Sequence, residues 1–146
     1  MTRAAKARYF SARHLAIGFT GYFCFINLYS PQAILPLLSS EFGAGAAEIA
    51  SIMTASSLAV ALTAAFSGTV ADVLGRKRVI VTAMFVLAVP TIMVAMAPSL
   101  SAMIFWRFVQ GLAMPPVFAV TIAYIGEELS PREATMAAGV YTSGAS

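Results

Sequence analysis

The sequence predicts an all-α membrane protein that crosses the bilayer several times. Of its 146 residues, 60% are hydrophobic and only 10% are charged, whereas soluble domains contain roughly 25% charged residues. The charged residues are also unevenly placed, because residues 49–71 and 79–106 contain none. Runs of this length can cross a hydrocarbon core of ~30 Å as helices. This composition excludes an ordinary soluble domain.

Residues 1–14 form a basic segment in front of the first apolar run. The segment contains arginine, lysine and one histidine, His14, but no acidic residue. Residues 15–38 follow without a charged residue and are longer than the roughly 7–15 residues of a signal-peptide core. We therefore predict a first transmembrane helix over 15–38 rather than a removable leader.

The second and third helices are predicted at 49–71 and 79–97. The loop 39–48 in front of them contains two glutamates and no lysine or arginine. Small residues recur at every fourth position of the second helix, which predicts faces that another helix can approach closely. These residues are Ala55, Ala59, Thr63 and Ser67 on one face, and Ser57, Ala61 and Ala65 on another.

A fourth helix is predicted at 100–125, with a kink at Pro115 and Pro116 because proline lacks a backbone N–H. Ser130, Pro131 and Glu133 then match an N-cap serine, a proline at the first helical position and a glutamate three residues after the cap. This pattern predicts a fifth helix over 131–146. Its rise of only about 24 Å is short of a full span.

The distribution of basic residues predicts the orientation of these helices. The amino terminus and the stretch 68–78 are basic, whereas the loops 39–48 and 98–101 lack lysine and arginine. Lysine and arginine accumulate on the cytoplasmic side of membrane proteins. We therefore expect a multi-pass protein of the cell inner membrane with a cytoplasmic N-terminus. The 126–133 loop should lie on the cytoplasmic side by alternation.

The stretch 68–78 is the one place where glycine and charge separate two long apolar runs, and we predict a tight polar hairpin there. The basic residues alone could be topology anchors. The spacing of the whole set nevertheless resembles the loop signature between the second and third helices of the major facilitator superfamily. Val73 departs from that signature, which usually has a basic residue there. The resemblance implies a cytoplasmic latch between two transporter halves, formed by Gly68, Asp72, Gly75, Arg76, Lys77 and Arg78.

Arg107 is the second unusual residue, because it lies about seven residues into the fourth predicted span. A central arginine costs on the order of 2.5–3.5 kcal/mol on insertion scales, so it faces a cavity or a partner, or snorkels to the surface. Arg107, Gln110 and Gly111 resemble the fourth-helix motif of the same superfamily, which implies a role in proton coupling. The match is partial, because Ala113, Met114 and Pro115 replace the usual glycine and alanines.

The first predicted helix has polar residues on two faces. One face contains Tyr22, Tyr29 and Gln32, and the other contains Thr20, Cys24 and Asn27. The spacing of Tyr29, Gln32 and Pro36 is similar to a bacterial efflux branch of the superfamily, which implies that the Tyr29 face lines a cavity. Interhelical hydrogen bonds, worth about 0.6 kcal/mol each, are the alternative. The candidate lining residues are Tyr22, Asn27, Tyr29 and Gln32.

The sequence shows no pattern expected of an enzyme or a nucleic-acid-binding protein. It contains no nucleotide-binding loop, no paired catalytic carboxylates and no metal-ligand cluster. Its lysines and arginines lie at the ends of apolar runs rather than on one face of a domain. We expect no cofactor, no metal and no nucleic-acid partner.

The resemblance covers nearly the whole chain and implies the first four to five helices of a major facilitator superfamily fold, an incomplete N-terminal six-helix half. The implied function is proton-coupled efflux of small molecules by alternating access, with the proton gradient as the energy source. The expected partners are the lipid bilayer, a small-molecule substrate and a missing C-terminal half. The alternatives are a small four-helix exporter, a non-transporting membrane scaffold or a truncated inactive product. The exporter is disfavoured because it needs a membrane-embedded acid, and none lies between His14 and Glu41.

Overall fold

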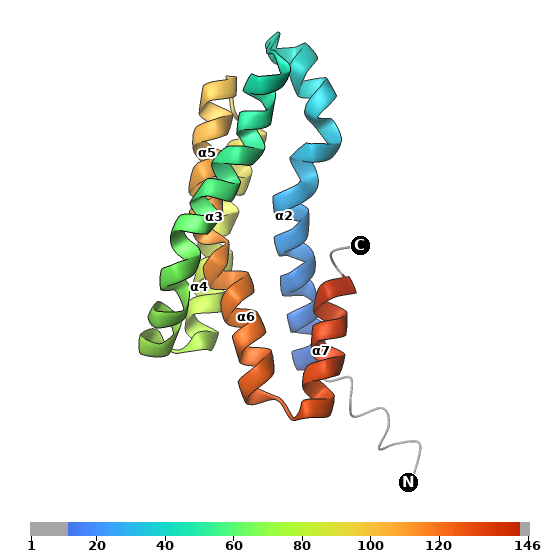
Figure 1. Cartoon of the computed structure of the whole chain (residues 1–146), viewed down its shortest axis with the longest axis vertical. Helices are drawn as coiled ribbons and strands as arrows, with labels where there is room; N and C mark the ends of the chain where they lie inside the picture. Colours follow the sequence, from blue (N-terminus) through green and yellow to red (C-terminus); the bar gives the residue numbers. More distant parts are fainter. Residues whose placement is uncertain (1–11, 144–146) are drawn as a thin grey trace.

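The computed structural model describes residues 12–143, which form helices joined by short turns (Figure 1). Residues 1–11, most of the predicted basic segment 1–14, lie outside the described residues. The first two helices are α2 (Ala12–Phe42) and α3 (Ala46–Leu74). Gly43 ends α2 with a φ of 59°, a conformation that glycine adopts without steric cost.

Four shorter helices follow and complete the described chain. They are α4 (Arg76–Ala95), α5 (Leu100–Ala113), α6 (Pro115–Glu128) and α7 (Pro131–Ser143). Within the described range, three helical segments are long and apolar enough to cross a membrane, namely Ala46–Leu74, Arg76–Ala95 and Leu100–Glu127. The last of these joins α5 and α6, so the second, third and fourth predicted spans each correspond to one segment.

The first predicted span differs from the others in its polarity. α2 has 31 residues and is long enough to cross a bilayer, but it is not among the three apolar segments. Polar residues such as Thr20, Asn27 and Gln32 lower its hydropathy. Pro31 and Pro36 lie inside the helix without ending it.

The connection between α3 and α4 is much shorter than the predicted hairpin. Gly68 and Asp72 lie inside α3, and α4 begins at Arg76, so only Gly75 lies outside both helices. Gly75 has a φ of 87°, and its N–H donates to the Ala71 carbonyl at 2.9 Å. The predicted extent of 68–78 was wrong, because polar residues near a membrane surface continue a helix as readily as apolar ones.

The predicted kink and the predicted start of the fifth helix are confirmed. The helix breaks at Met114, and α6 begins at Pro115. α7 begins at Pro131, with the Glu133 carboxylate accepting hydrogen bonds from both the backbone N–H and the hydroxyl of Ser130, at 3.2 and 2.6 Å. The serine and glutamate thus fix this helix start as the sequence pattern predicts.

Small residues allow two pairs of helices to pack closely. Ala59 on α3 is fully buried, and a Cβ atom added to Gly111 of α5 would lie 2.5 Å from the Ser56 carbonyl oxygen. The other predicted small face of α3, at Ser57, Ala61 and Ala65, is exposed. A Cβ atom added to Gly21 of α2 would lie 2.6 Å from the Tyr141 carbonyl oxygen of α7.

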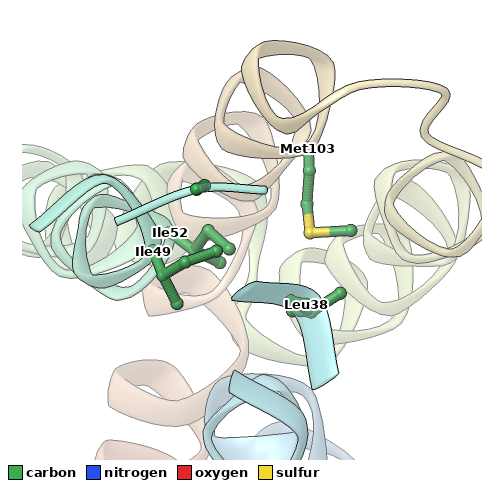
Figure 2. Close-up of a cluster of buried hydrophobic side chains, with 5 residues drawn as sticks. Leu38, Ile49, Ile52 and Met103 are labelled. Atoms are coloured by element: carbon green, nitrogen blue, oxygen red, sulfur yellow. The ribbon is translucent and has the colours of Figure 1, made fainter. Parts of the chain in front are cut away.

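Two apolar clusters at opposite ends of the bundle hold α2 in place. One cluster joins α2, α3 and α5 through Leu38, Ile49, Ile52 and Met103 (Figure 2). The other joins α2, α6 and α7 through Ile17, Ile125, Ala137 and Tyr141. The middle of α2, between these clusters, is where the polar residues of the bundle meet.

Candidate functional site

Arg107 on α5 lies at the centre of a buried polar network. Only 1% of the surface of this residue is exposed to solvent. Nη1 donates to the Asn27 carbonyl oxygen at 2.7 Å and to Gln110 Oε1, and Nη2 donates to the Leu28 carbonyl oxygen at 3.0 Å. Of the two possibilities left open by the sequence, the structure therefore shows Arg107 facing partners rather than snorkelling to the surface.

The proline in α2 explains why a backbone carbonyl is available to Arg107. In a regular helix the Asn27 carbonyl would accept a hydrogen bond from the N–H of the residue four positions later. That residue is Pro31, which has no N–H. A buried carbonyl without a donor is costly in a membrane, so the guanidinium group takes the place of the missing backbone donor.

Three further side chains connect α2, α4 and α5 beside Arg107. Gln110 Nε2 donates to Asn27 Oδ1 at 2.8 Å and to Thr91 Oγ1 at 3.0 Å. The Thr91 hydroxyl lies 2.7 Å from both Asn27 Oδ1 and the Leu87 carbonyl oxygen, and it donates its single proton to one of them at a time. The network thus joins three helices through the side-chain amides of Asn27 on α2 and Gln110 on α5 and the hydroxyl of Thr91 on α4.

The packing of α3 against α5 also contacts this site. The Ser56 hydroxyl lies 3.2 Å from the Arg107 carbonyl oxygen and 3.3 Å from the Ile52 carbonyl oxygen. Gly111, the third predicted motif residue on α5, allows this approach because it has no side chain. It positions the helix that holds Arg107 and does not contact the network itself.

Two cavities adjoin the network. A cavity of about 350 Å³ lies between α2, α4 and α5, with Arg107 and Gln110 in its lining. A more apolar cavity of about 520 Å³ lies mainly between α2 and α4. Asn27 and Thr91 line both cavities, so the hydrogen-bonded network lies between them.

The predicted lining residues of α2 are divided between the network and the surface. Asn27 is part of the network. Tyr22 and Tyr29 are about half exposed, at 48% and 50%, and Gln32 is also exposed. The structure does not bring these three side chains to Arg107, and the prediction that their face lines a cavity stays a prediction.

The charged turn is organised around a second arginine, Arg76. Its Nη1 atom lies 2.6 Å from Glu127 Oε2 on α6, and its Nη2 atom lies 3.5 Å from Asp72 Oδ1. Nη1 also donates to the Ala123 carbonyl oxygen at 3.3 Å. Arg76 thus joins the beginning of α4 to the end of α6, whereas Lys77 and Arg78 are exposed.

The charges at this end of the bundle oppose the preferences of the helix dipole. Basic residues begin α4, although a helix N-terminus favours acidic ones, and the acidic Asp72 and Glu127 lie near helix C-termini. Each such placement costs about 0.3–1 kcal/mol. The ion pairs of Arg76 offset part of this cost, so helix stability alone does not explain the cluster.

Sequence reasoning missed Thr91, Ser56 and Glu127 as partners of the motif residues. Thr91 and Ser56 lie in apolar spans, and no local pattern distinguishes them from other packing residues. Glu127 could have been found, because the topology places its loop on the same side as Arg76. Among residues 12–143, no group of three or more histidine, cysteine, aspartate or glutamate side chains could hold a metal ion.

Comparison with known proteins shows the family to which this chain belongs. The model of the Major Facilitator Superfamily matches residues 15–146. The inner membrane transport protein YnfM of Escherichia coli (strain K12) is 35% identical over 130 residues, which are 89% of this chain and 31% of that protein. An uncharacterized transporter of Buchnera aphidicola, BU588, is 34% identical over 130 residues, which are 89% of this chain and 32% of that protein.

These relatives are named as transporters, which points to transport rather than catalysis. The chain spans about a third of the length of the curated relatives it matches. No solved structure matches it significantly. The motif spacing, the apolar helices and the family match agree: this multi-pass membrane chain belongs to the Major Facilitator Superfamily.

Proposed function

We propose that the chain is the N-terminal part of a proton-coupled secondary transporter that exports small molecules across the cell inner membrane by alternating access. The main support is the buried Arg107, which is bonded to α2 where Pro31 interrupts the helix. Ionisable residues inside membrane proteins mark ion and substrate pathways. A helix that lacks a backbone hydrogen bond at a proline can bend there, so Arg107 contacts α2 at a position where the helix can change its shape.

The network provides a physical link between a charge and a change of shape. The Thr91 proton can go to Asn27 Oδ1 or to the Leu87 carbonyl oxygen, so a switch between the two changes the hydrogen bonding of Asn27. A proton that enters near Arg107 would change the electrostatic field at this junction and shift α2 relative to α4 and α5. The proton-carrying group of this mechanism is not assigned to a residue of the chain.

The charged turn would act as the cytoplasmic latch in this proposal. Arg76 holds α4 to α6, and Asp72, Lys77 and Arg78 remain exposed for contact with a second half of the transporter. The turn, the α6–α7 loop and the beginning of α2 lie at one end of the bundle (Figure 1). The excess of basic residues at this end supports a cytoplasmic placement.

Transport in inverted membrane vesicles tests the proposal. Vesicles from cells that make the complete gene product would be given a proton gradient and a panel of amphipathic dyes and monosaccharides. We expect proton-dependent accumulation that a protonophore abolishes. Asp72→Asn and Arg107→Ala should each reduce it when accumulation is divided by the amount of protein in the membrane.

Ser57→Ala is the matched control, because Ser57 is exposed on α3 and belongs to neither motif. It should leave transport unchanged. If Asp72→Asn and Arg107→Ala also left transport unchanged, the two motifs would have no role in it. If the wild-type vesicles accumulated nothing, the scaffold alternative would be favoured.

A further inference from the structure

Arg107 is a buried cation without a negatively charged partner among residues 12–143. Its hydrogen-bond acceptors are the carbonyl oxygens of Asn27 and Leu28 and the amide oxygen of Gln110. The acidic side chains of Asp72 and Glu127 form ion pairs with Arg76 instead. These neutral oxygens accept three hydrogen bonds but do not cancel the charge, and an uncompensated buried charge is unfavourable.

Part of the guanidinium group also lacks a hydrogen-bond partner. The buried Nε atom has none among the described residues. Within the same part of the chain, Nη2 has two protons but one acceptor, the Leu28 carbonyl oxygen. An arginine binds carboxylates with two parallel N–H donors, and Nε together with one Nη atom forms such an edge. The unpartnered side of Arg107 therefore has the chemistry of a carboxylate site.

The adjoining cavity of about 350 Å³ provides space for a ligand. Its polar lining includes Asn27, Ser30, Thr91 and Gln110 as well as Arg107. Its apolar lining includes Ile34, Val94, Leu38 and Met103, of which the last two are drawn in Figure 2. Small-molecule sites are typically of this size and combine apolar walls with a few polar groups.

The only acidic residue in this lining does not neutralise Arg107. Glu41 is exposed and lies 14 residues after Asn27 on α2, about 21 Å along the helix axis. Glu41 lines the same cavity but forms no ion pair with Arg107. The cavity thus has a positive end at Arg107 and no described charge beside it.

We propose that this cavity binds a small organic monoanion, with its carboxylate on the Nε and Nη2 edge of Arg107 and its apolar body against Ile34 and Val94. Nε is covered in the unliganded chain, so binding requires a shift of side chains beside it, which is common at binding sites. That the bound anion is a transported substrate rests on the proposed function. The binding itself does not.

Benzoate and benzamide form a matched pair of probes, because they share a shape and differ in charge. Binding to the purified complete gene product in nanodiscs can be measured by titration calorimetry. We expect saturable binding of benzoate and at least about tenfold weaker binding of benzamide. Equal affinity for the two probes, or no binding of benzoate, would overturn the proposal.

Arg107→Lys keeps the charge but removes the planar pair of donors. It should weaken benzoate binding by at least about tenfold, because lysine does not replace a bidentate arginine. Unchanged affinity in the folded variant would contradict the proposed contact. Size-exclusion chromatography shows whether the variant is folded.

Two alanines of α4 provide a test that leaves the network intact. Ala95 lines the proposed site, whereas Ala88, two turns earlier on the same side of the helix, lines the cavity between α2 and α4. Ala95→Leu should weaken benzoate binding by at least about tenfold by filling the cavity, and Ala88→Leu should not change it. Equal effects of the two substitutions would place any binding elsewhere, whether or not Arg107→Lys folds.

The outcomes for this site and for the proposed function are separable. A protein that binds benzoate as described but shows no proton-driven transport would refute the function and keep the site. A protein that transports but does not distinguish benzoate from benzamide would refute the site alone.

Discussion

Arg107 and Arg76 lie in opposite environments, one inside the helix bundle and one at its end. Arg107 is 1% exposed and donates to neutral oxygens, two of them on a helix about 80 residues earlier in the chain. Arg76 bonds acidic side chains that are 68% and 64% exposed. An arginine side chain thus bonds to neutral carbonyl and amide oxygens inside the bundle and to exposed carboxylates at its end. Burial, rather than the formal charge of the partner, should decide how much each contact contributes to stability.

Removal of Arg107 should have the largest effect in this comparison. Arg107→Leu removes the donor to three oxygen atoms, of which the Asn27 carbonyl has no backbone N–H to replace it, and we expect a loss of roughly 3–5 kcal/mol in the free energy of unfolding. Unfolding of the complete gene product in mixed micelles, followed by circular dichroism, measures the loss.

Pro31→Ala provides the corresponding control, because it restores the N–H that Asn27 needs. In that background Arg107→Leu should be less destabilising than in the wild type. Equal costs in the two backgrounds would show that the proline and the arginine act independently.

The same glycine substitution should have opposite effects in the two regions. Gly111→Ala places a methyl group 2.5 Å from the Ser56 carbonyl oxygen, and this overpacking should cost about 1–3 kcal/mol. Gly68→Ala, near the charged turn, meets no atom within 4 Å and should be neutral or stabilising by up to about 1 kcal/mol. The unfolding midpoint of each variant is compared with that of the wild type. Equal shifts of the two midpoints would contradict the packing argument.

Loss of a single hydroxyl in the network should have an intermediate effect. Thr91→Val keeps the shape of the side chain but removes a group that Gln110 donates to. We expect a cost of about 0.6–1.7 kcal/mol, between the average and the maximum found for side-chain hydrogen bonds in a membrane protein. Thr91→Ser keeps the hydroxyl, and the same unfolding measurement should place it closer to the wild type than Thr91→Val.

The smallest effect is expected at the charged turn. Glu127→Gln removes the shorter ion pair of Arg76, and exposed pairs contribute at most about 1 kcal/mol. The difference from the wild type should also shrink in 1 M salt, where the Debye length is ~3 Å. A loss of unfolding free energy as large as that of Arg107→Leu, or a loss that does not depend on salt, would contradict the comparison. It would show that burial does not decide how much the contacts of the two arginines contribute to stability.

Local spacing in the sequence was sufficient for the family and for most helix positions. The motif glycines and charges, the kink at Pro115 and the start of α7 depend on residues close together in the chain, and such patterns are visible without a structure. The extent of the 68–78 hairpin was wrong because the end of an apolar run was taken as the end of a helix. Helices continue into water when their charged side chains can be solvated.

The buried network could be predicted only in part. Arg107 and Gln110 were identified by their spacing, and Asn27 was singled out as polar, but their mutual contacts depend on how three helices pack. Thr91 gave no signal at all. The missing donor at Pro31 did indicate that the Asn27 carbonyl needs an external partner, and a search for buried donors elsewhere in the sequence would have led to Arg107.

The dependence of α2 on Arg107 has a consequence for biosynthesis. The Asn27 carbonyl and its donor are 80 residues apart, and ribosomes add about 5–20 residues per second. For roughly 4–16 seconds, therefore, the first helix is made while its donor does not yet exist. During this interval the Asn27 carbonyl oxygen needs water or lipid headgroups as a substitute donor, so α2 should reach its final depth in the membrane only after α5 has been inserted. Cysteine-accessibility labelling of ribosome-stalled chains, ending before and after Arg107, would show whether the position of α2 changes between the two lengths.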